Sequence, residues 1–423
     1  MRRLIANLAA EDAWATGSGR SARPLSRAAA DAAASWGSLL RVFARGEDRL
    51  DLLAPIDRRR LTDALPRPRL HLVDFDHTSR RTAGEAELWW AAPQVQPTFL
   101  PGEAGREAID ALVRTATRDL HRAIPDVSVA RALLRPQRPT DLGPRLWATP
   151  PPAGAARAAD RRLVVALAAR LGVGPPGARP IDTVDDLRRA IAGEPDLGGP
   201  WVLKSALSAA GRHRLWSNGA RFDEEAVARL LQRGPAVVEP WDDRRLDAGL
   251  RLWIDDRPLR GEAHGTDAVE PLALVGWHAL EVGARGRFLG IETGRSLDDT
   301  LGGLDDAEAL GLARALRALG FLLQDLGVRG PVALDLRRTR EGVLRPLGEI
   351  NPRLSFGYLA AEIARRLTAD GRVERAAGRL RAIPRASKRS SLGIRLLEPD
   401  ASGGGGLVFE PESSLKCLAD DGR

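Results

Sequence analysis

Two apolar segments, each interrupted by an acidic residue, constrain the fold of this chain more than any other feature. Residues 330–336 read Gly-Pro-Val-Ala-Leu-Asp-Leu, and residues 347–353 read Leu-Gly-Glu-Ile-Asn-Pro-Arg. A turn-forming stretch between them predicts that the two segments are paired antiparallel strands. Because side chains alternate along a strand, Glu349 and Asn351 project from the same face, and Asp335 meets them from the neighbouring strand.

These three side chains have the chemistry of a metal site. Two carboxylates and one amide oxygen suit Mg²⁺, with phosphate oxygens and water completing its shell, and Mn²⁺ is an alternative. We therefore predict Asp335, Glu349 and Asn351 as metal ligands. The other explanation is a hairpin with merely solvated acids, but these acids interrupt apolar strands, and a buried acid needs a partner. Arg353 lies at the next same-face position, where it can grip a carboxylate or an acyl phosphate, and Ser355 is a candidate helix N-cap.

Lysine is rare in this chain, which uses Arg almost everywhere else. Two of its three lysines, Lys388 and Lys416, lie in a polar C-terminal stretch, whereas Lys204 ends an apolar, strand-like run. A compact point charge that approaches a phosphate is a physical reason for Lys at this position. Small side chains also let backbone N–H groups approach phosphate oxygens, although such loops are common and the motif alone is weak. The small residues that follow include Ser208, Ala209 and Gly211.

A third candidate is the apolar stretch of residues 236–241, which reads Ala-Val-Val-Glu-Pro-Trp. As a hinge between two lobes, it offers groups of Val238, Glu239 and Trp241 to an adenine edge. Asp247, further along the chain, is a candidate for binding ribose hydroxyls. Two nearer aspartates compete with it for that role.

Composition excludes several classes of protein. The chain has 423 residues, of which 43% are hydrophobic and 28% charged, the balance of a globular protein rather than a disordered one. Arg and acids alternate along the apolar stretches, so we expect no membrane span, and the N-terminus lacks the apolar core of a secretion signal. The single Cys417 rules out an internal disulfide. We expect a cytoplasmic protein.

The formal charge of +8 does not by itself indicate nucleic-acid binding. Arg and acidic residues are interspersed, no basic arm is present, and aromatic residues make up 4% without being interleaved with the basic ones. We therefore expect no nucleic-acid partner.

The pattern of apolar residues predicts alternating helices and strands. Helices are predicted at residues 26–45, 106–124, 160–171, 183–191, 224–232, 307–326 and 358–367. Strands are predicted at residues 3–8, 70–75, 201–204, 236–239, 332–336 and 344–350, with hairpin-like stretches at 250–260 and 274–291. This order predicts an α/β (α+β) fold with an open α/β domain first.

Taken in chain order, the strand ending in Lys204, the hinge at residues 236–241 and the pattern from Asp335 to Glu349-Ile350-Asn351-Pro352-Arg353 resemble the ATP-grasp superfamily. The resemblance covers about residues 160–367, roughly half of the chain. It implies three structural parts with ATP between the last two. The expected division is an N-terminal α/β domain at 1–150, linker helices and a small lid at 151–235, a C-terminal antiparallel-sheet domain at 236–385, and a polar tail at 386–423.

The resemblance also implies roles for the candidate residues. Lys204 would contact the α/β phosphates, and the loop of Ser208, Ala209 and Gly211 would close over the β/γ phosphates. Glu239 and its neighbours would hold adenine, and Asp247 would hold ribose. Asp335, Glu349 and Asn351 would hold two Mg²⁺ ions, and Arg353 would steady an acyl phosphate. The family's earlier nucleotide-contacting Lys has no counterpart here, and whether Arg161 replaces it is open. Ala333 and Leu334 stand where some ligases carry an Arg.

The implied activity is an ATP- and Mg²⁺-dependent ligase that activates a small-molecule carboxylate as an acyl phosphate for attack by an amine or thiol. A small-molecule kinase on the same fold and a non-catalytic nucleotide-binding protein remain alternatives, and a homo-oligomer is compatible with the sequence. His264, Trp277 and His278 could face a substrate cleft, although an ordinary structural role is favoured for each.

Overall fold

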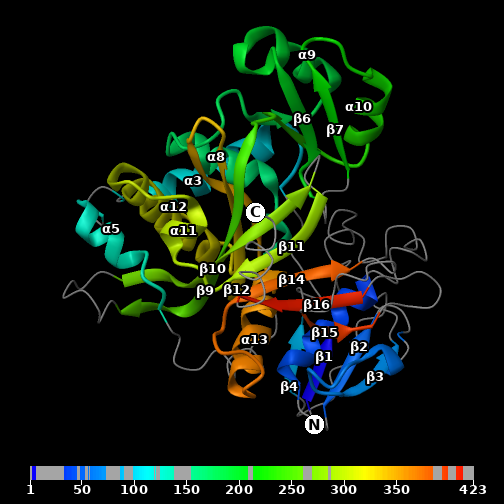
Figure 1. Cartoon of the computed structure of the whole chain (residues 1–423). Coiled ribbons are helices and arrows are strands. Elements are labelled where there is room, and N and C mark those ends of the chain that lie inside the picture. The colour runs from blue at the N-terminus through cyan, green and yellow to red at the C-terminus, as the bar shows by residue number, and fades with distance from the viewer. Residues whose placement is uncertain are drawn as a thin grey trace, which may run out of the picture.

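The computed structural model describes residues 2–5, 33–44, 48–52, 56, 58–72, 86–89, 99–118, 120, 124–137, 154–207, 213–260, 269–283, 287–383, 393–398 and 406–412. Their strands form three sheets (Figure 1). The lid sheet lies at the top of the view, the largest sheet in the middle and the N-terminal sheet at the bottom.

The largest sheet has eight strands in the order β13-β12-β9-β10-β11-β14-β16-β15, and all neighbours are antiparallel. The predicted pairing of the two acid-bearing strands and the hairpin of β10 with β11 are confirmed. The hairpin predicted at residues 250–260 is wrong, because the alternating apolar residues there continue one long strand, β9. The strands are β9 Arg244–Arg260, β10 Val269–Gly283, β11 Arg287–Thr293, β12 Gly330–Thr339, β13 Leu344–Asn351, β14 Gly378–Ile383, β15 Ile394–Leu397 and β16 Gly406–Pro411.

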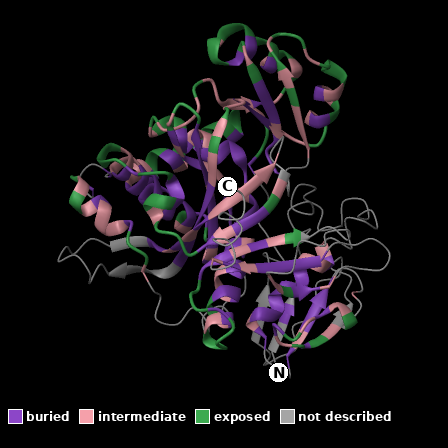
Figure 2. Cartoon of the chain, in the orientation of Figure 1, coloured by how far each residue is buried: buried purple, intermediate pink, exposed green. Residues whose placement is uncertain are grey.

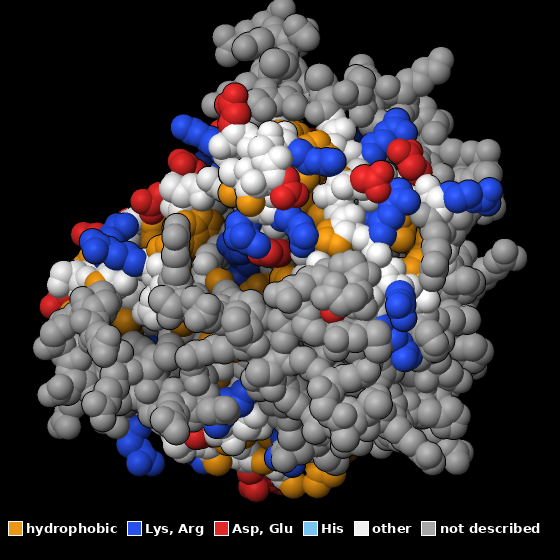
Figure 3. All heavy atoms as spheres, turned by 90° about the horizontal axis from the view of Figure 1, so that it is seen from below, with side chains coloured by type: hydrophobic (Ala, Val, Ile, Leu, Met, Phe, Trp, Pro, Cys, Tyr) orange, Lys and Arg blue, Asp and Glu red, His pale blue; other side chains and the backbone are white. Residues whose placement is uncertain are grey.

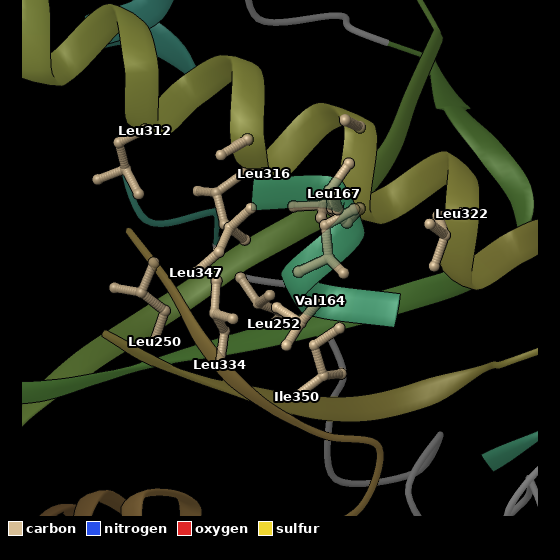
Figure 4. Packing of buried hydrophobic residues seen from close by; sticks show 14 of the residues in the cluster. Val164, Leu167, Leu250, Leu252, Leu312, Leu316, Leu322, Leu334, Leu347 and Ile350 are labelled. Carbon is tan, nitrogen blue, oxygen red and sulfur yellow. The ribbon is translucent and has the colours of Figure 1, made fainter. Parts of the chain in front are cut away.

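Helices cover one face of this sheet at its β9, β12 and β13 end. Alternate residues of these strands, such as Leu250, Leu334 and Ile350, pack against α8 (Arg161–Arg170) and α12 (Asp306–Asp325), as Figure 4 shows. The strand residues between them therefore point to the opposite face, which carries the polar candidates.

Two further helices join this core, although they come from the part of the chain predicted to form the N-terminal domain. The helices α3 (Gly102–Thr117) and α5 (Val127–Leu133) pack on α12. Ile109, Val113 and Ala130 are buried in the same cluster as Leu316. Their apolar stripes are covered by α12 rather than by the N-terminal sheet.

The N-terminal sheet is parallel, in the order β3-β2-β1-β4, as the alternation of strands and helices predicts. It packs through η1 (Ser38–Phe43) against α13 (Phe356–Ala369), and both belong to one apolar cluster with Trp253 and Ile291 of the large sheet. The strands are β1 Arg2–Ile5, β2 Arg49–Leu52, β3 Arg69–Leu72 and β4 Ala86–Trp89. Helix α13 therefore lies between the N-terminal sheet and the polar face of the large sheet.

The stretch predicted as a polar tail, residues 386–423, contributes β15 and β16 to the large sheet. Leu407 and Phe409 of β16 are buried. The continuous apolar run of residues 407–409 is thus ordered by pairing with β14, although Gly-rich sequence precedes it.

The lid is an antiparallel sheet in the order β5-β8-β6-β7. One of its faces packs Trp201, Leu203 and Val238 against α9 and α10, so this small unit has an apolar core of its own. Figure 2 shows this buried interior beneath the exposed outer sides of the two helices. The elements are β5 Arg179–Ile181, α9 Val184–Gly193, β6 Pro200–Ser205, β7 Arg214–Asn218, α10 Glu224–Leu231 and β8 Ala236–Pro240. A capping box of Thr183 and Asp186 begins α9, where the sequence predicts a helix.

Within the described residues, no helix is long and apolar enough to cross a membrane. On the face seen in Figure 3, the Lys and Arg side chains of described residues lie among Asp and Glu side chains. The positive net charge is therefore mixed with negative charge on that face.

Candidate active site

The candidate metal ligands meet on the polar face of the large sheet. Asp335 of β12 lies directly opposite Glu349 of β13, and Asn351 lies opposite Ala333. The Asn351 Nδ2 group lies 3.5 Å from Asp335 Oδ2. A bulge in β13 beside Asp335 includes Gly348, where an added Cβ would lie 2.7 Å from the Asp335 carbonyl oxygen. The close approach of the two strands at this point therefore requires glycine.

The two carboxylates differ in their electrostatic surroundings. Burial and the neighbouring Glu349 raise the pKa of Asp335 to about 7, against the opposing charge of Arg353. Burial would also raise the pKa of Glu349, but Arg161 outweighs it and the pKa is lowered. Two adjacent, half-buried acids favour a bound cation. No described cluster holds three or more His, Cys, Asp or Glu side chains, so a metal here needs the Asn351 amide and outside oxygens.

Arg353 and Ser355 lie between this pair and α13. Arg353 Nη2 donates to Asn351 Oδ1 at 2.9 Å, so in this state the amide oxygen faces Arg353. Ser355 occupies the predicted N-cap position, but its side chain makes no capping bond. Its Oγ is instead buried without a hydrogen-bond partner among the described residues.

The lid brings Lys204 and Glu239 to the other side of the site. Their strands β6 and β8 are paired, and the Lys204 ammonium donates to Glu239 Oε1. Burial alone would raise the pKa of Glu239. The positive charges of Lys204 and Arg337 outweigh burial and lower this pKa to about 2. Burial lowers the pKa of Lys204, opposed by Glu239. Glu239 is therefore charged and held by the cations around it.

Arg337 of β12 is a site residue that sequence reasoning missed. Its Nη2 lies 3.0 Å from Asp242 Oδ2 and 3.8 Å from Glu239 Oε2, so it links the large sheet to the hinge. Its spacing, two residues after Asp335 on the same strand, was a usable signal. Arg is so abundant in this chain that this one did not stand out in the sequence.

Arg161 connects the lid strand to the metal strand. It begins α8, and its Nη1 donates to the Ser205 carbonyl at 2.7 Å while its Nη2 donates to Glu349 Oε1 at 2.9 Å. The side chain is buried, 7% exposed. Arg161, whose role the sequence left open, is thus a cation fixed between β6 and β13.

The hinge residues are arranged in a ladder of aromatic rings and guanidinium groups. The rings of Trp241 and Trp216 meet edge to face at 6.0 Å, and Arg244 and Arg214 lie over them at 4.8 and 4.6 Å. Asp247, the ribose candidate, accepts from Arg244 Nη1 at 2.8 Å.

Other candidates are placed elsewhere. The Val238 side chain lies in the lid core, so only its backbone could face a nucleotide. Trp277 donates from Nε1 to the Arg295 carbonyl at 2.8 Å and packs against the core on the α12 side. Ser208, Ala209, Gly211 and His264 lie outside the described residues.

Comparisons with known proteins rest on structure alone. No protein-family model matches the chain, and a search of curated proteins finds no match. N5-carboxyaminoimidazole synthetase from Staphylococcus aureus is 9% identical with a TM-score of 0.51, covering 91% of this chain and 94% of its own. The same enzyme complexed with ADP is 10% identical with a TM-score of 0.50, covering 91% of this chain and 93% of its own. Biotin carboxylase from Campylobacter jejuni is 11% identical with a TM-score of 0.49, covering 99% of this chain and 89% of its own. The chain has the ATP-grasp fold.

Proposed function

We propose that this chain is an ATP- and Mg²⁺-dependent ligase that activates a small-molecule carboxylate for attack by an amine or thiol. One observation carries the proposal. The paired acids Asp335 and Glu349 face Lys204 and Arg161 across the junction of the lid and the large sheet. A polyphosphate with its metal needs both kinds of charge at one place. The ADP complex of the Staphylococcus aureus enzyme, which has a similar fold, supports nucleotide binding by this chain.

The residues fit a nucleotide and its metal. Asp335, Glu349 and Asn351 would hold Mg²⁺, because two carboxylates and an amide lie together on one face of the paired strands. When bound, Mg²⁺ would neutralise phosphate charge. Lys204 and Arg161 would bind phosphate oxygens. Adenine would lie against the hinge at Glu239 and Trp241, Asp247 would bind ribose, and the segment with Ser208, Ala209 and Gly211 would cover the phosphates.

The chemistry would proceed in two steps. A carboxylate oxygen attacks the γ-phosphorus, an acyl O–P bond forms, the β,γ-bridging P–O bond breaks, and ADP leaves. The nucleophile then attacks the acyl carbon, its new bond replaces the C–O bond, inorganic phosphate leaves, and the nucleophile's proton passes to water. Arg353, which donates to the Asn351 amide oxygen and to the Leu354 carbonyl, would hold the acyl phosphate bidentately. The protein contributes positioning and charge neutralisation.

An ADP-release screen of the purified chain against pools of carboxylic acids and amino acids tests the proposal. We expect carboxylate-dependent ADP release that requires Mg²⁺. Added hydroxylamine should trap the acyl phosphate as a hydroxamate. ADP release with a phosphorylated alcohol and no hydroxamate would identify a kinase. Tight ATP binding without turnover on any pool would identify a non-catalytic nucleotide-binding protein.

A further inference from the structure

Arg251 of β9 is a cation on the polar face of the large sheet that none of the steps above uses. It lies opposite Ala333, two residues along the strand from Gly249, which lies opposite Asp335. Among the described residues it has no hydrogen bond and no ion pair, and its Nε is fully enclosed. The rest of the side chain is half-buried. A cation held in this way favours an anion from outside the chain.

The guanidinium of Arg251 has a defined direction. It leans over Gly276 of β10, where an added Cβ would lie 2.2 Å from Arg251 Nη2. It therefore points away from β12 and Asp335, toward β10. A larger side chain at Gly276 would displace the guanidinium from this position.

His278 lies beside it, two residues further along β10 and on the same face. The ring is 2% exposed and fills the space between two glycines, since an added Cβ on Gly249 or Gly357 would lie 2.3 or 2.2 Å from ring atoms. Nδ1 is buried with no hydrogen-bond partner among the described residues. Burial, with a smaller effect of Arg251, lowers the pKa of His278 to about 3, so the ring is neutral.

The His278 Nδ1 atom faces the beginning of α13. An added Cβ on Gly357, in the first turn of this helix, would lie 2.4 Å from Nδ1. The Oγ of the N-cap residue Ser355 is also buried without a described partner. The first amides of a helix carry partial positive charge and bind anions. A neutral imidazole and a hydroxyl group thus lie at one helix N-terminus without hydrogen-bond partners among the described residues, and the cation Arg251 lies near the imidazole.

The carboxylates of the site do not pair with Arg251. Glu349 pairs with Arg161, Asp247 pairs with Arg244, and Asp335 is next to Asn351. The partner for which this cluster is suited is therefore a ligand.

We propose that Arg251 and His278, at the N-terminus of α13, form a subsite that binds a carboxylate of a substrate, distinct from the carboxylate that is phosphorylated. This rests on the proposed function, because the phosphorylated group must reach the side of Asp335, whereas Arg251 points toward β10. The substrate set therefore includes a second carboxylate. It belongs either to an amino-acid nucleophile or to a dicarboxylic acid, and both present the same chemistry to Arg251.

Binding is tested without turnover by NMR of the full chain labelled in its His rings, saturated with ADP and Mg²⁺. The probes are glycine, D- and L-alanine, succinate and glutarate, with glycinamide, alaninamide and succinamide as neutral counterparts. The chain has six histidines, so His278→Gln assigns the His278 signal. We expect a saturable shift of that signal with at least one carboxylate and none with its amide, and loss of the shift in Arg251→Met. An unmoved signal with all probes, or an unchanged shift in Arg251→Met, would overturn the subsite.

Arg251→Met also needs a folding control. We expect its thermal midpoint to be no lower than that of the wild type, because no described partner is lost. The matched variant Arg338→Met should lower the midpoint, since Arg338 is equally an interior Arg of the large sheet but binds Glu308 and the Leu301 carbonyl. A large loss of stability in Arg251→Met would show that the residue is structural and would overturn the proposal.

The kinetic readout separates this subsite from the activity itself. With the substrate pair found by ADP release, Arg251→Met should raise KM for the carboxylate-bearing partner by about 10- to 100-fold and leave KM for ATP within about twofold. An unchanged KM for every substrate would reject the subsite while the ligase assignment stands. A carboxylate-dependent His278 shift in a protein that never turns over ATP would reject the ligase assignment while the subsite stands.

Discussion

Arg161 Nη2 donates to Glu349 Oε1 at 2.9 Å, so a residue at the beginning of α8 neutralises one of the candidate metal ligands. The other arm of the same guanidinium binds the Ser205 carbonyl at the end of the lid strand β6. One side chain therefore couples β6 to β13, the strand of the candidate ligands Glu349 and Asn351.

Replacing Arg161 with Ala should weaken ATP binding and also remove the link between β6 and β13. We expect KM for ATP to rise about 10- to 100-fold, since a charge-assisted interaction is lost. Arg170→Ala, at the exposed end of the same helix, is the control and should leave KM unchanged. Nucleotide binding is measured by calorimetry. Equal dissociation constants for the two variants would show that Arg161 does not bind the nucleotide.

Glu349→Gln should abolish ATP turnover while the protein remains folded. The amide keeps the shape of the side chain but removes one anionic ligand and the ionic partner of Arg161. ADP release is the measurement, and circular dichroism melting confirms folding. Wild-type turnover at ordinary Mg²⁺ concentration would show that Glu349 is not a ligand.

Local sequence signals predicted the elements that carry their own determinants. The capping box at Thr183 and Asp186 fixed the beginning of α9, and alternation with a turn predicted the pairing of β12 with β13. The same alternation brings Asp335 opposite Glu349. Such features depend on neighbours in the chain, so a single sequence reveals them.

Features that depend on distant packing were missed. Helices α3 and α5 pack on α12, a partner that their own amphipathic patterns do not specify. The strand β16 is ordered by β14 despite a Gly-rich approach. Arg251 and Arg337 could not be told from the many other arginines in the sequence, because only burial and contacts distinguish an interior Arg from a surface one.

Activity should depend on the shape of the cationic group at position 204 as well as on its charge. Lys204→Ala should lower kcat/KM for ATP by about 100-fold, the cost of losing one preorganised donor. Lys204→Arg should not restore full activity, because a planar fork replaces a compact ammonium that pairs with Glu239 in an enclosed position. Steady-state kinetics of both variants decide this, and full activity of the Arg variant would make Lys incidental there.

Asp335 should make the nucleotide-free protein less stable as pH rises. Burial and Glu349 raise the pKa of Asp335 to about 7, so the folded state holds its proton more tightly than the unfolded state does. Stability from this group is therefore present at low pH and lost as pH rises from about 4 through 7. Asp335→Asn should raise the thermal midpoint at pH 8 and change it less at pH 5, whereas the exposed Asp243→Asn should show no such pH dependence. A pH-independent effect of Asp335→Asn would contradict the assignment.

The lid segment from Ser205 to Arg214 should gain protection from hydrogen exchange when nucleotide binds. Its flanking strands are already anchored, because Trp201 and Leu203 pack in the lid core and the Ser205 amide donates to the His213 carbonyl at 3.0 Å. Any protection gained between these strands therefore reports on the loop itself rather than on folding of the lid. Lys204 and the loop amides gain phosphate partners only when ATP is present, and a loop that closes over phosphates belongs to the less stable part of a structure.

Exchange across this segment, with and without a non-hydrolysable ATP analogue and Mg²⁺, measures the effect. The internal control is the lid helix α9, whose capping box and buried Leu187 do not involve the nucleotide, so its exchange should stay constant. Lys204→Ala should bind the analogue more weakly but reach the same protection of the loop amides at saturation. If protection across residues 205–214 is unchanged while calorimetry confirms binding, the nucleotide phosphates lie elsewhere, and the assignment of Ser208, Ala209 and Gly211 to phosphate binding is wrong.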